Sequence, residues 1–253
     1  MIATLRSIIF NIVLYSTGTL YGTLCLTFLV APKMARFHLV LLWVRFAMWW
    51  LQVSCGIKIV VIDHNGGKLD SPHVVLSKHQ TMFETLFLQH YFLPISTIFK
   101  RSLLRLPFFG WGLSLLRPIP IDRSSPVKAL KEVQEKGKRR IEEGLHVLVF
   151  PEGTRIPVGK VGNYARSGAD IAKKAGVNIV PVAHNAGECW PAKHFTKHAG
   201  EIRVVIGKPI VTEGRNSKEL IEEVRDWIEG EIAKMPPGRK DQQRASASVT
   251  AET

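Results

Sequence analysis

The chain opens with two long apolar stretches that differ in how cleanly they exclude charge. Residues 7–32 hold 26 consecutive uncharged residues, which as a helix would reach roughly 39 Å against a hydrocarbon core of about 30 Å. Residues 37–57 carry Arg45 near their middle and three tryptophans, which favour a membrane interface. The pattern predicts a two-helix membrane anchor over residues 1–56.

Smaller features refine this anchor. A break is expected at residues 31–32, where Ala-Pro interrupts the pattern, with the second helix lying shallowly or packed on the first. Gly18 and Gly22 are spaced for close helix contact, although two glycines can also fall four apart by chance. A cleaved secretory signal is disfavoured, because its apolar region would be only about 7–15 residues long.

Beyond Gly56 the pattern changes to short β-branched runs that alternate with amphipathic segments. Strands are predicted at 57–62, 73–77, 95–99, 145–150, 178–182 and 201–206, and helices at 82–92, 126–143, 164–175 and 217–234. This alternation predicts an α/β fold, a mixed and largely parallel sheet flanked by helices, over residues 57–235. The polar, aromatic-free residues 236–253 are expected to form a disordered tail.

The charge balance indicates anionic partners. The chain has 34 Lys plus Arg against 21 Asp plus Glu, a formal net charge of +13, which suits nucleic acid, an anionic membrane leaflet or phosphorylated small molecules. Residues 1–56 contain basic but no acidic residues within apolar sequence. Position along the chain therefore favours an anionic membrane surface over nucleic acid.

The metal-ligating residue types show no spacing that indicates a bound metal. The three cysteines form no CxxC pair and cannot all be paired within one molecule, so a disulfide framework is not expected and a reducing cytoplasmic compartment is favoured. The nine histidines include no HExxH. We expect neither a metal nor another bound cofactor.

The first candidate site pairs His79 with Glu84 at the junction between a predicted strand and a predicted helix. Five residues apart on a regular helix they would face different ways, so they can meet only if His79 precedes the helix. Glu84 could then fix the imidazole tautomer and leave the other nitrogen as a base for a substrate hydroxyl. No GxSxG nucleophile is present. A plain surface pair is the alternative for two residues at this spacing.

A second candidate site follows the predicted strand at 145–150 and reads Pro-Glu-Gly-Thr-Arg over residues 151–155. Loops at the carboxyl ends of strands usually bind ligands in α/β proteins. Arg155 offers a planar cation suited to phosphate, and Gly153 permits close backbone approach. The alternative is a tight turn with a local ion pair between Glu152 and Arg155.

A third cluster is cationic and aromatic. Residues 97–128 hold six cationic residues and one acid, and Lys100 and Arg101 precede the Pro-Phe-Phe-Gly run at 107–110. This composition suits an amphiphile with an anionic head and apolar tail, or a nucleic-acid platform with stacking aromatics. The adjoining anchor favours lipid.

These motifs together resemble the glycerophosphate acyltransferase family. The resemblance rests on His79-x4-Glu84, on residues 99–101 with 107–110, on residues 150–155, and on Val-Pro-Val at 180–182, in this order. It implies transfer of a fatty acyl group from acyl-CoA or acyl-ACP to the 2-hydroxyl of 1-acyl-sn-glycerol 3-phosphate, a lysophosphatidic acid, in phospholipid biosynthesis. It further implies a bacterial inner membrane location, with the catalytic domain on the cytoplasmic face.

The resemblance also assigns roles to residues. His79 would be the general base, Glu84 its orienting partner and Arg155 the main phosphate clamp. The remaining residues that it implicates in substrate binding are Lys100, Arg101, Glu152, Gly153 and Thr154. The chain departs from the family pattern at Glu84, where Asp is common, and at Ser102, where an acidic residue is common.

The sequence alone leaves several alternative functions and substrates open. The acceptor could be another lyso-lipid, and water could replace the alcohol, which would make the protein a thioester hydrolase. A non-catalytic basic membrane-binding protein would not need His79. Acyl-chain length, the choice between coenzyme A and acyl carrier protein, oligomeric state and whether residues 7–32 span the bilayer or enter one leaflet are equally open.

Overall fold

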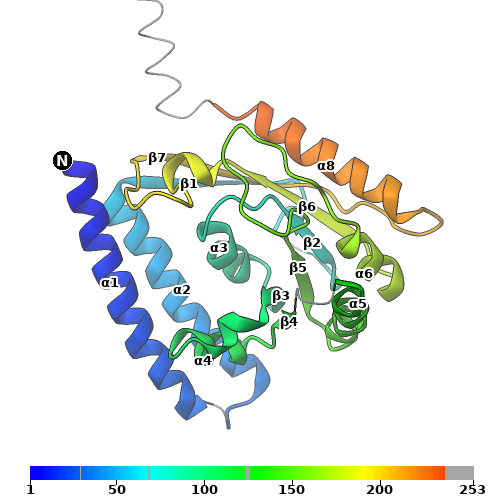
Figure 1. Cartoon of the computed structure of the whole chain (residues 1–253), viewed down its shortest axis with the longest axis horizontal. Helices are drawn as coiled ribbons and strands as arrows, with labels where there is room; N and C mark the ends of the chain where they lie inside the picture. Colours follow the sequence, from blue (N-terminus) through cyan, green and yellow to red (C-terminus); the bar gives the residue numbers. More distant parts are fainter. Residues whose placement is uncertain (29, 68, 123–125, 237–253) are drawn as a thin grey trace, which may run out of the picture.

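The protein was analysed as a computed structural model that describes residues 1–28, 30–67, 69–122 and 126–236. Within these residues, a single mixed sheet lies between two layers of helices (Figure 1). The strands are β1 (Ile57–Asp63), β2 (Val74–Ser77), β3 (Ile95–Lys100), β4 (Ile119–Ile121), β5 (His146–Val149), β6 (Ile179–His184) and β7 (Gly200–Ile206). The α-helices are α1 (Ile2–Leu24), α2 (Lys33–Cys55), α3 (Phe83–Tyr91), α4 (Phe109–Leu115), α5 (Pro126–Glu142), α6 (Ser167–Ala175), α7 (Ala186–Cys189) and α8 (Ser217–Ala233). Two 3-10 helices, η1 (Cys25–Phe28) and η2 (Arg101–Arg105), complete the set.

The sheet has the order β1-β7-β6-β2-β5-β3-β4. All neighbouring strands are parallel except β6 and β7, which are antiparallel. This confirms the predicted α/β class with a largely parallel sheet. Because β2, β5 and β3 are adjacent and parallel, the loops that follow them leave from the same edge of the sheet.

Side-chain alternation along the strands explains the two helical layers. On β2, Val74 and Leu76 pack in one buried cluster with side chains of α5, α6 and α8, whereas Val75 packs in another with α1, α2 and α3. Strands buried on both faces are expected in a parallel sheet covered by helices. The helices at the chain's start are thus one wall of the core.

The N-terminal helices are both long and apolar enough to cross a membrane by length and composition. They pack against each other, and the Trp43 indole donates a hydrogen bond to Thr17 at 3.1 Å. Helix α2 runs unbroken through Arg45 to Cys55 and is followed by Gly56, which adopts a left-handed conformation with φ of 67°. Side chains of α1 and α2 share one buried cluster with the sheet, so packing continues across the predicted boundary at residue 56.

Some elements were not predicted. These are β4, α4, α7 and the two 3-10 helices, which are between three and seven residues long. Segments this short carry too few periods of the hydrophobic pattern to be recognised. The predicted disordered tail lies outside the described residues from residue 237 onward.

Candidate active site

Three motif segments follow three neighbouring parallel strands. His79 follows β2, the loop at 151–155 follows β5, and Lys100 ends β3. The β2 and β5 loops touch directly, since the Ile156 amide donates to the His79 carbonyl at 2.8 Å. The sheet therefore places the predicted base and the predicted phosphate clamp side by side.

His79 and Glu84 meet in the geometry that the sequence required. Helix α3 begins at Phe83, so His79 precedes it, and His79 Nδ1 donates to Glu84 Oε1 at 2.8 Å. The side chain of His79 is 15% exposed, that of Glu84 1%. No described residue is hydrogen bonded to His79 Nε2, which is left as the basic nitrogen.

Glu84 is held ionised by its surroundings. Its carboxylate accepts hydrogen bonds from the amides of Gln80 and Thr81 at 2.8 and 2.7 Å and from the Thr81 hydroxyl at 2.8 Å. Burial alone would raise the pKa of Glu84, but the nearby His184 and His79 and the Thr81 amide lower it to about 2. The carboxylate can therefore fix the His79 tautomer at neutral pH.

His184 supports the same loop from β6. Its Nε2 donates to the Lys78 carbonyl at 2.9 Å, and its Nδ1 accepts the Ala186 amide at 3.2 Å. Burial lowers the pKa of His184, which agrees with a neutral ring that donates through Nε2. His184 thus orients the strand end before His79.

The loop after β5 presents Arg155 to solvent. Arg155 is exposed and forms no ion pair with any described residue, so the alternative of a local pair with Glu152 is not what the structure shows. Gly153 adopts a φ of 64°, a conformation that favours glycine, and both it and Thr154 are exposed. The guanidinium is available to an anionic ligand.

Glu152 occupies the interior of the site. Its Oε1 accepts the Lys78 ammonium at 2.8 Å and the Gly162 amide at 3.2 Å, while Oε2 accepts the His79 amide at 3.0 Å. Its side chain is fully buried. Glu152 therefore shapes the site by tying the β2 and β5 loops together.

Lys100 and Arg101 lie at the end of β3 and the start of η2. Lys100 is exposed and no described residue pairs with it. Arg101 lies 3.4 Å from Glu132 and 3.9 Å from Asp122. Both carboxylates are partly exposed, so these pairs are weak and leave Arg101 able to turn toward a ligand.

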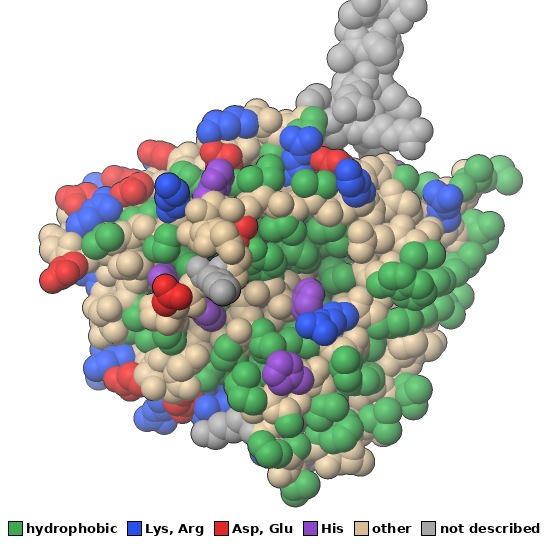
Figure 2. Space-filling view, turned by 180° about the vertical axis from the view of Figure 1, so that it is seen from behind, with side chains coloured by type: hydrophobic (Ala, Val, Ile, Leu, Met, Phe, Trp, Pro, Cys, Tyr) green, Lys and Arg blue, Asp and Glu red, His purple; other side chains and the backbone are tan. Residues whose placement is uncertain are grey.

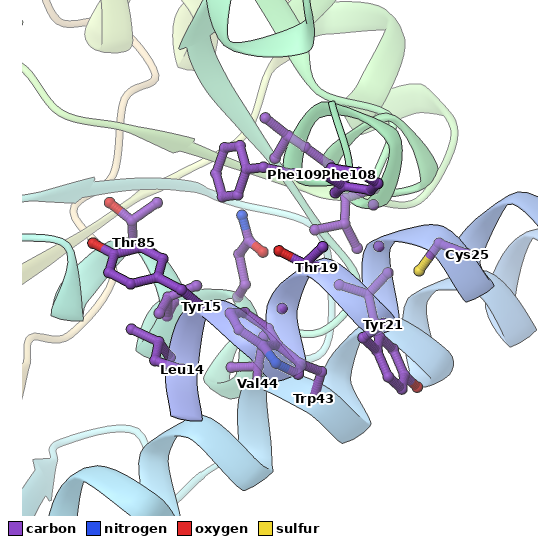
Figure 3. A pocket seen from close by; sticks show the side chains of 18 of the residues that line it. Leu14, Tyr15, Thr19, Tyr21, Cys25, Trp43, Val44, Thr85, Phe108 and Phe109 are labelled. Carbon is purple, nitrogen blue, oxygen red and sulfur yellow. The ribbon is translucent and has the colours of Figure 1, made fainter. Parts of the chain in front are cut away.

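An apolar cavity of about 170 Å³ lies beside the start of α3, and its lining residues do not include His79, Glu84 or Arg155. Met82, which caps α3, and Thr85 in the first turn of α3 line the cavity. Helices α1 and α2 form another wall, and Phe108 and Phe109 lie across from them (Figure 3). Helices α1 and α2 therefore line this cavity.

Sequence reasoning did not find every residue of the site. Lys78 and Glu229 were not singled out, and neither was Phe150 as a ring partner, although its ring stacks on His79 with centroids 4.1 Å apart. Lys78 stands beside His79 in the sequence, which was the one available signal. Glu229 lies about 150 residues away on α8 and gave none.

The described residues thus place a histidine–carboxylate pair beside an arginine that pairs with none of them, and an apolar cavity lies next to α3. The chain belongs to the acyltransferase family, whose model matches residues 58–185. Its fold resembles the crystal structure of the 1-acyl-sn-glycerophosphate (LPA) acyltransferase, PlsC, from Thermotoga maritima, with a TM-score of 0.76 and 24% identity, covering 92% of this chain and 97% of that one.

Named relatives share its sequence. The 1-acyl-sn-glycerol-3-phosphate acyltransferase of Pseudomonas aeruginosa is 41% identical over 93% of each chain. The chloroplastic 1-acyl-sn-glycerol-3-phosphate acyltransferase LPAT1 of Arabidopsis thaliana is 31% identical over 63% of this chain and 44% of its own length. The chain is therefore an enzyme of the acyltransferase class.

Proposed function

We propose that this enzyme transfers a fatty acyl group from acyl-CoA or acyl-ACP to the 2-hydroxyl of 1-acyl-sn-glycerol 3-phosphate, giving phosphatidic acid. The observation that carries the proposal is the His79–Glu84 pair at 2.8 Å beside Arg155, which forms no ion pair with a described residue. The relative in Pseudomonas aeruginosa, similar over 93% of both chains, bears the name of this activity.

In the proposed reaction His79 Nε2 removes the proton of the acceptor hydroxyl. The oxygen attacks the thioester carbonyl carbon, the carbon–sulfur bond breaks, and the imidazolium returns the proton to the departing thiolate. Glu84 stays ionised and stabilises the imidazolium through Nδ1. The step needs no covalent acyl-enzyme, which agrees with the absence of a serine elbow in the sequence.

The cations are proposed to bind the acceptor phosphate. Arg155 can supply a bidentate contact, and Lys100 and Arg101 add positive charge from the neighbouring strand end. The apolar cavity beside α3 suits an acyl chain, because it is lined by α1, α2 and the Phe108–Phe109 turn.

We propose that the two N-terminal helices enter one leaflet of a bacterial inner membrane, with the catalytic part on the cytoplasmic face. Both ends of α1 contact the catalytic part: Lys197 bonds to Ser7 and Asn11, and Gly22 lies against Phe108. A full crossing would carry those contacts into hydrocarbon. The apolar side chains gathered along one side of the molecule would face lipid (Figure 2).

Substitution of the base and its partner tests the mechanism. Turnover of lysophosphatidic acid and an acyl thioester by the purified protein in detergent is expected to fall by about 10²–10⁴ in His79→Ala and less in Glu84→Ala. His64→Ala alters an exposed histidine outside the site and is the matched control. Wild-type turnover by His79→Ala would end the proposed mechanism.

Arg155→Ala tests the phosphate clamp separately. It should weaken binding of the acceptor in the transition state, with the thioester KM unchanged. An effect on thioester use alone would exclude the assigned role.

The substrates are tested by comparison. Rates with lysophosphatidic acid and with lysophospholipids identify the acceptor, and rates with acyl-CoA and with acyl-ACP identify the donor. Loss of thioester without a lipid product would indicate a hydrolase.

A further inference from the structure

A lysine is buried directly before the proposed base. The side chain of Lys78 is 1% exposed, and its ammonium donates to Glu152 Oε1 at 2.8 Å, to Glu229 Oε1 at 2.7 Å and to the Lys160 carbonyl at 3.2 Å. An ammonium has three N–H donors, so all of them are used. A buried charge is costly unless it is paired in this way.

The second carboxylate comes from a distant part of the chain. Glu229 lies on α8, outside all of the motifs, and its side chain is 21% exposed. The Tyr164 hydroxyl also donates to Glu229 Oε1, at 2.8 Å. Burial and the Glu229 carboxylate raise the pKa of Tyr164, so the hydroxyl keeps its proton and holds Glu229 in place.

The backbone around Lys78 is fixed from other directions. Its amide donates to the Val182 carbonyl at 3.1 Å, and its carbonyl accepts His184. Glu152 accepts both the Lys78 ammonium and the His79 amide. Glu229 is therefore linked to the His79 backbone by three hydrogen bonds, through Lys78 and Glu152.

We propose that Glu229 is a positioning residue for His79, acting through Lys78 and Glu152; this rests on His79 being the base of the proposed reaction. The carboxylates of Glu152 and Glu229 both bind the Lys78 ammonium, and together they fix its position. With Glu229 neutral, the Lys78 ammonium keeps Glu152 and the Lys160 carbonyl as partners but loses the second carboxylate that fixes its position. The Glu152 carboxylate, and the His79 amide bound to it, can then shift relative to the acceptor hydroxyl.

Replacement of Glu229 tests the proposal. Glu229→Gln keeps the shape and removes the charge, so kcat should fall by about tenfold while both KM values stay within about twofold. Glu222→Gln removes an exposed carboxylate from the same helix and should leave kcat unchanged. Wild-type kcat in Glu229→Gln, or a fall that appears only in KM, would overturn the proposal.

A double-mutant cycle tests the route through Lys78. In a Lys78→Met background, Glu229→Gln should no longer lower kcat, because the residue that transmits its effect is gone. Full additivity of the two kcat losses would overturn the proposal.

Tyr164→Phe provides a variant with a milder change, because it removes only the hydroxyl that donates to Glu229. It should lower kcat by about two- to fivefold at unchanged KM, and wild-type kcat would count against the proposal.

The activities of His79→Ala and Glu229→Gln distinguish failure of the proposed function from failure of the positioning role. If His79→Ala is as active as wild type, the proposed function has failed and Glu229 has no base to position. If His79→Ala is inactive and Glu229→Gln turns over like wild type, only the positioning role is lost.

Discussion

The imidazole of His79 lies flat on the ring of Phe150, with centroids 4.1 Å apart and an interplanar angle of 17°. Phe150 is the last residue before the Pro-Glu-Gly-Thr-Arg loop, so this segment contacts His79 through the Phe150 ring as well as through the hydrogen bond from the His79 amide to Glu152. Glu84 fixes one ring nitrogen and Phe150 fixes the ring plane. The two contacts together leave His79 little rotational freedom.

Phe150→Leu is expected to lower kcat by about tenfold, because the imidazole can rotate away from its productive plane. Phe150→Tyr keeps an aromatic ring at this partly exposed position and is expected to retain most activity. Steady-state kinetics of the two variants make the comparison. Equal activity in Phe150→Leu and wild type would show that the stack does not orient the base.

Glu84 should make the fold sensitive to acid. Its pKa is lowered from 4.5 to about 2, so its ionisation stabilises the folded state fully above pH about 4.5. That stabilisation, on the order of 3 kcal/mol, is lost as the pH falls from about 4.5 toward 2. Thermal melts in detergent between pH 6 and 3 should therefore show a steeper loss of Tm in wild type than in Glu84→Gln. Parallel curves would contradict the lowered pKa.

Gly22 should not tolerate a side chain. A Cβ at this position would lie 2.3 Å from the Phe108 carbonyl oxygen, which is backbone and cannot swing aside. Gly22→Ala is expected to destabilise the protein by about 1–3 kcal/mol and to change the acyl-chain preference, since α1 and Phe108 line the same cavity. The readouts are Tm and relative rates on thioesters of different length.

The matched control for Gly22 is Gly230 on α8. No atom lies within 4 Å of a Cβ built at Gly230, and alanine is the better helix former by about 1 kcal/mol. Gly230→Ala should therefore leave Tm equal or raise it. A Gly22→Ala variant as stable as Gly230→Ala would show that α1 can move away from Phe108 at no cost.

Lys197 joins α1 to the catalytic part through a buried polar contact. Its ammonium donates to Asn11 Oδ1 at 2.8 Å and lies 5.3 to 5.4 Å from the rings of Phe10, Trp190 and Phe195. Burial lowers the pKa of Lys197, and the described residues offer its ammonium no carboxylate partner. The contact therefore depends on the Asn11 amide, on the Phe195 carbonyl, which accepts the ammonium at 3.0 Å, and on the aromatic rings.

Lys197→Met should destabilise the protein by about 1–3 kcal/mol, because the buried Asn11 carbonyl oxygen loses its partner. The double variant Lys197→Met, Asn11→Leu removes both polar groups and should recover much of the loss. Thermal stability of wild type, the two single variants and the double variant measures this coupling. Losses that simply add would show that the two residues do not act as a pair.

Much of the fold follows from local sequence pattern. The six strands predicted from β-branched runs and the four helices predicted from amphipathic periodicity are present, with ends shifted by a few residues. Strand β4 and helix α4 were not predicted, since three- and seven-residue elements hold too little of either period. The spacing of Gly18 and Gly22 indicated close packing. It could not indicate that Gly18 faces Trp43 whereas Gly22 faces the Phe108 backbone.

The sequence by itself determined the chemistry available at the site: a histidine with a carboxylate five residues on, and an arginine after a buried strand. Tertiary structure alone decided that the loops after β2 and β5 touch, because strand order is a property of the sheet and not of either segment. It also decided that Glu152 points inward to Lys78 and that Glu229 joins them from α8. The carboxylate partners of a buried ammonium depend on which segments the fold brings together. No local sequence pattern therefore indicates a partner that lies about 150 residues away.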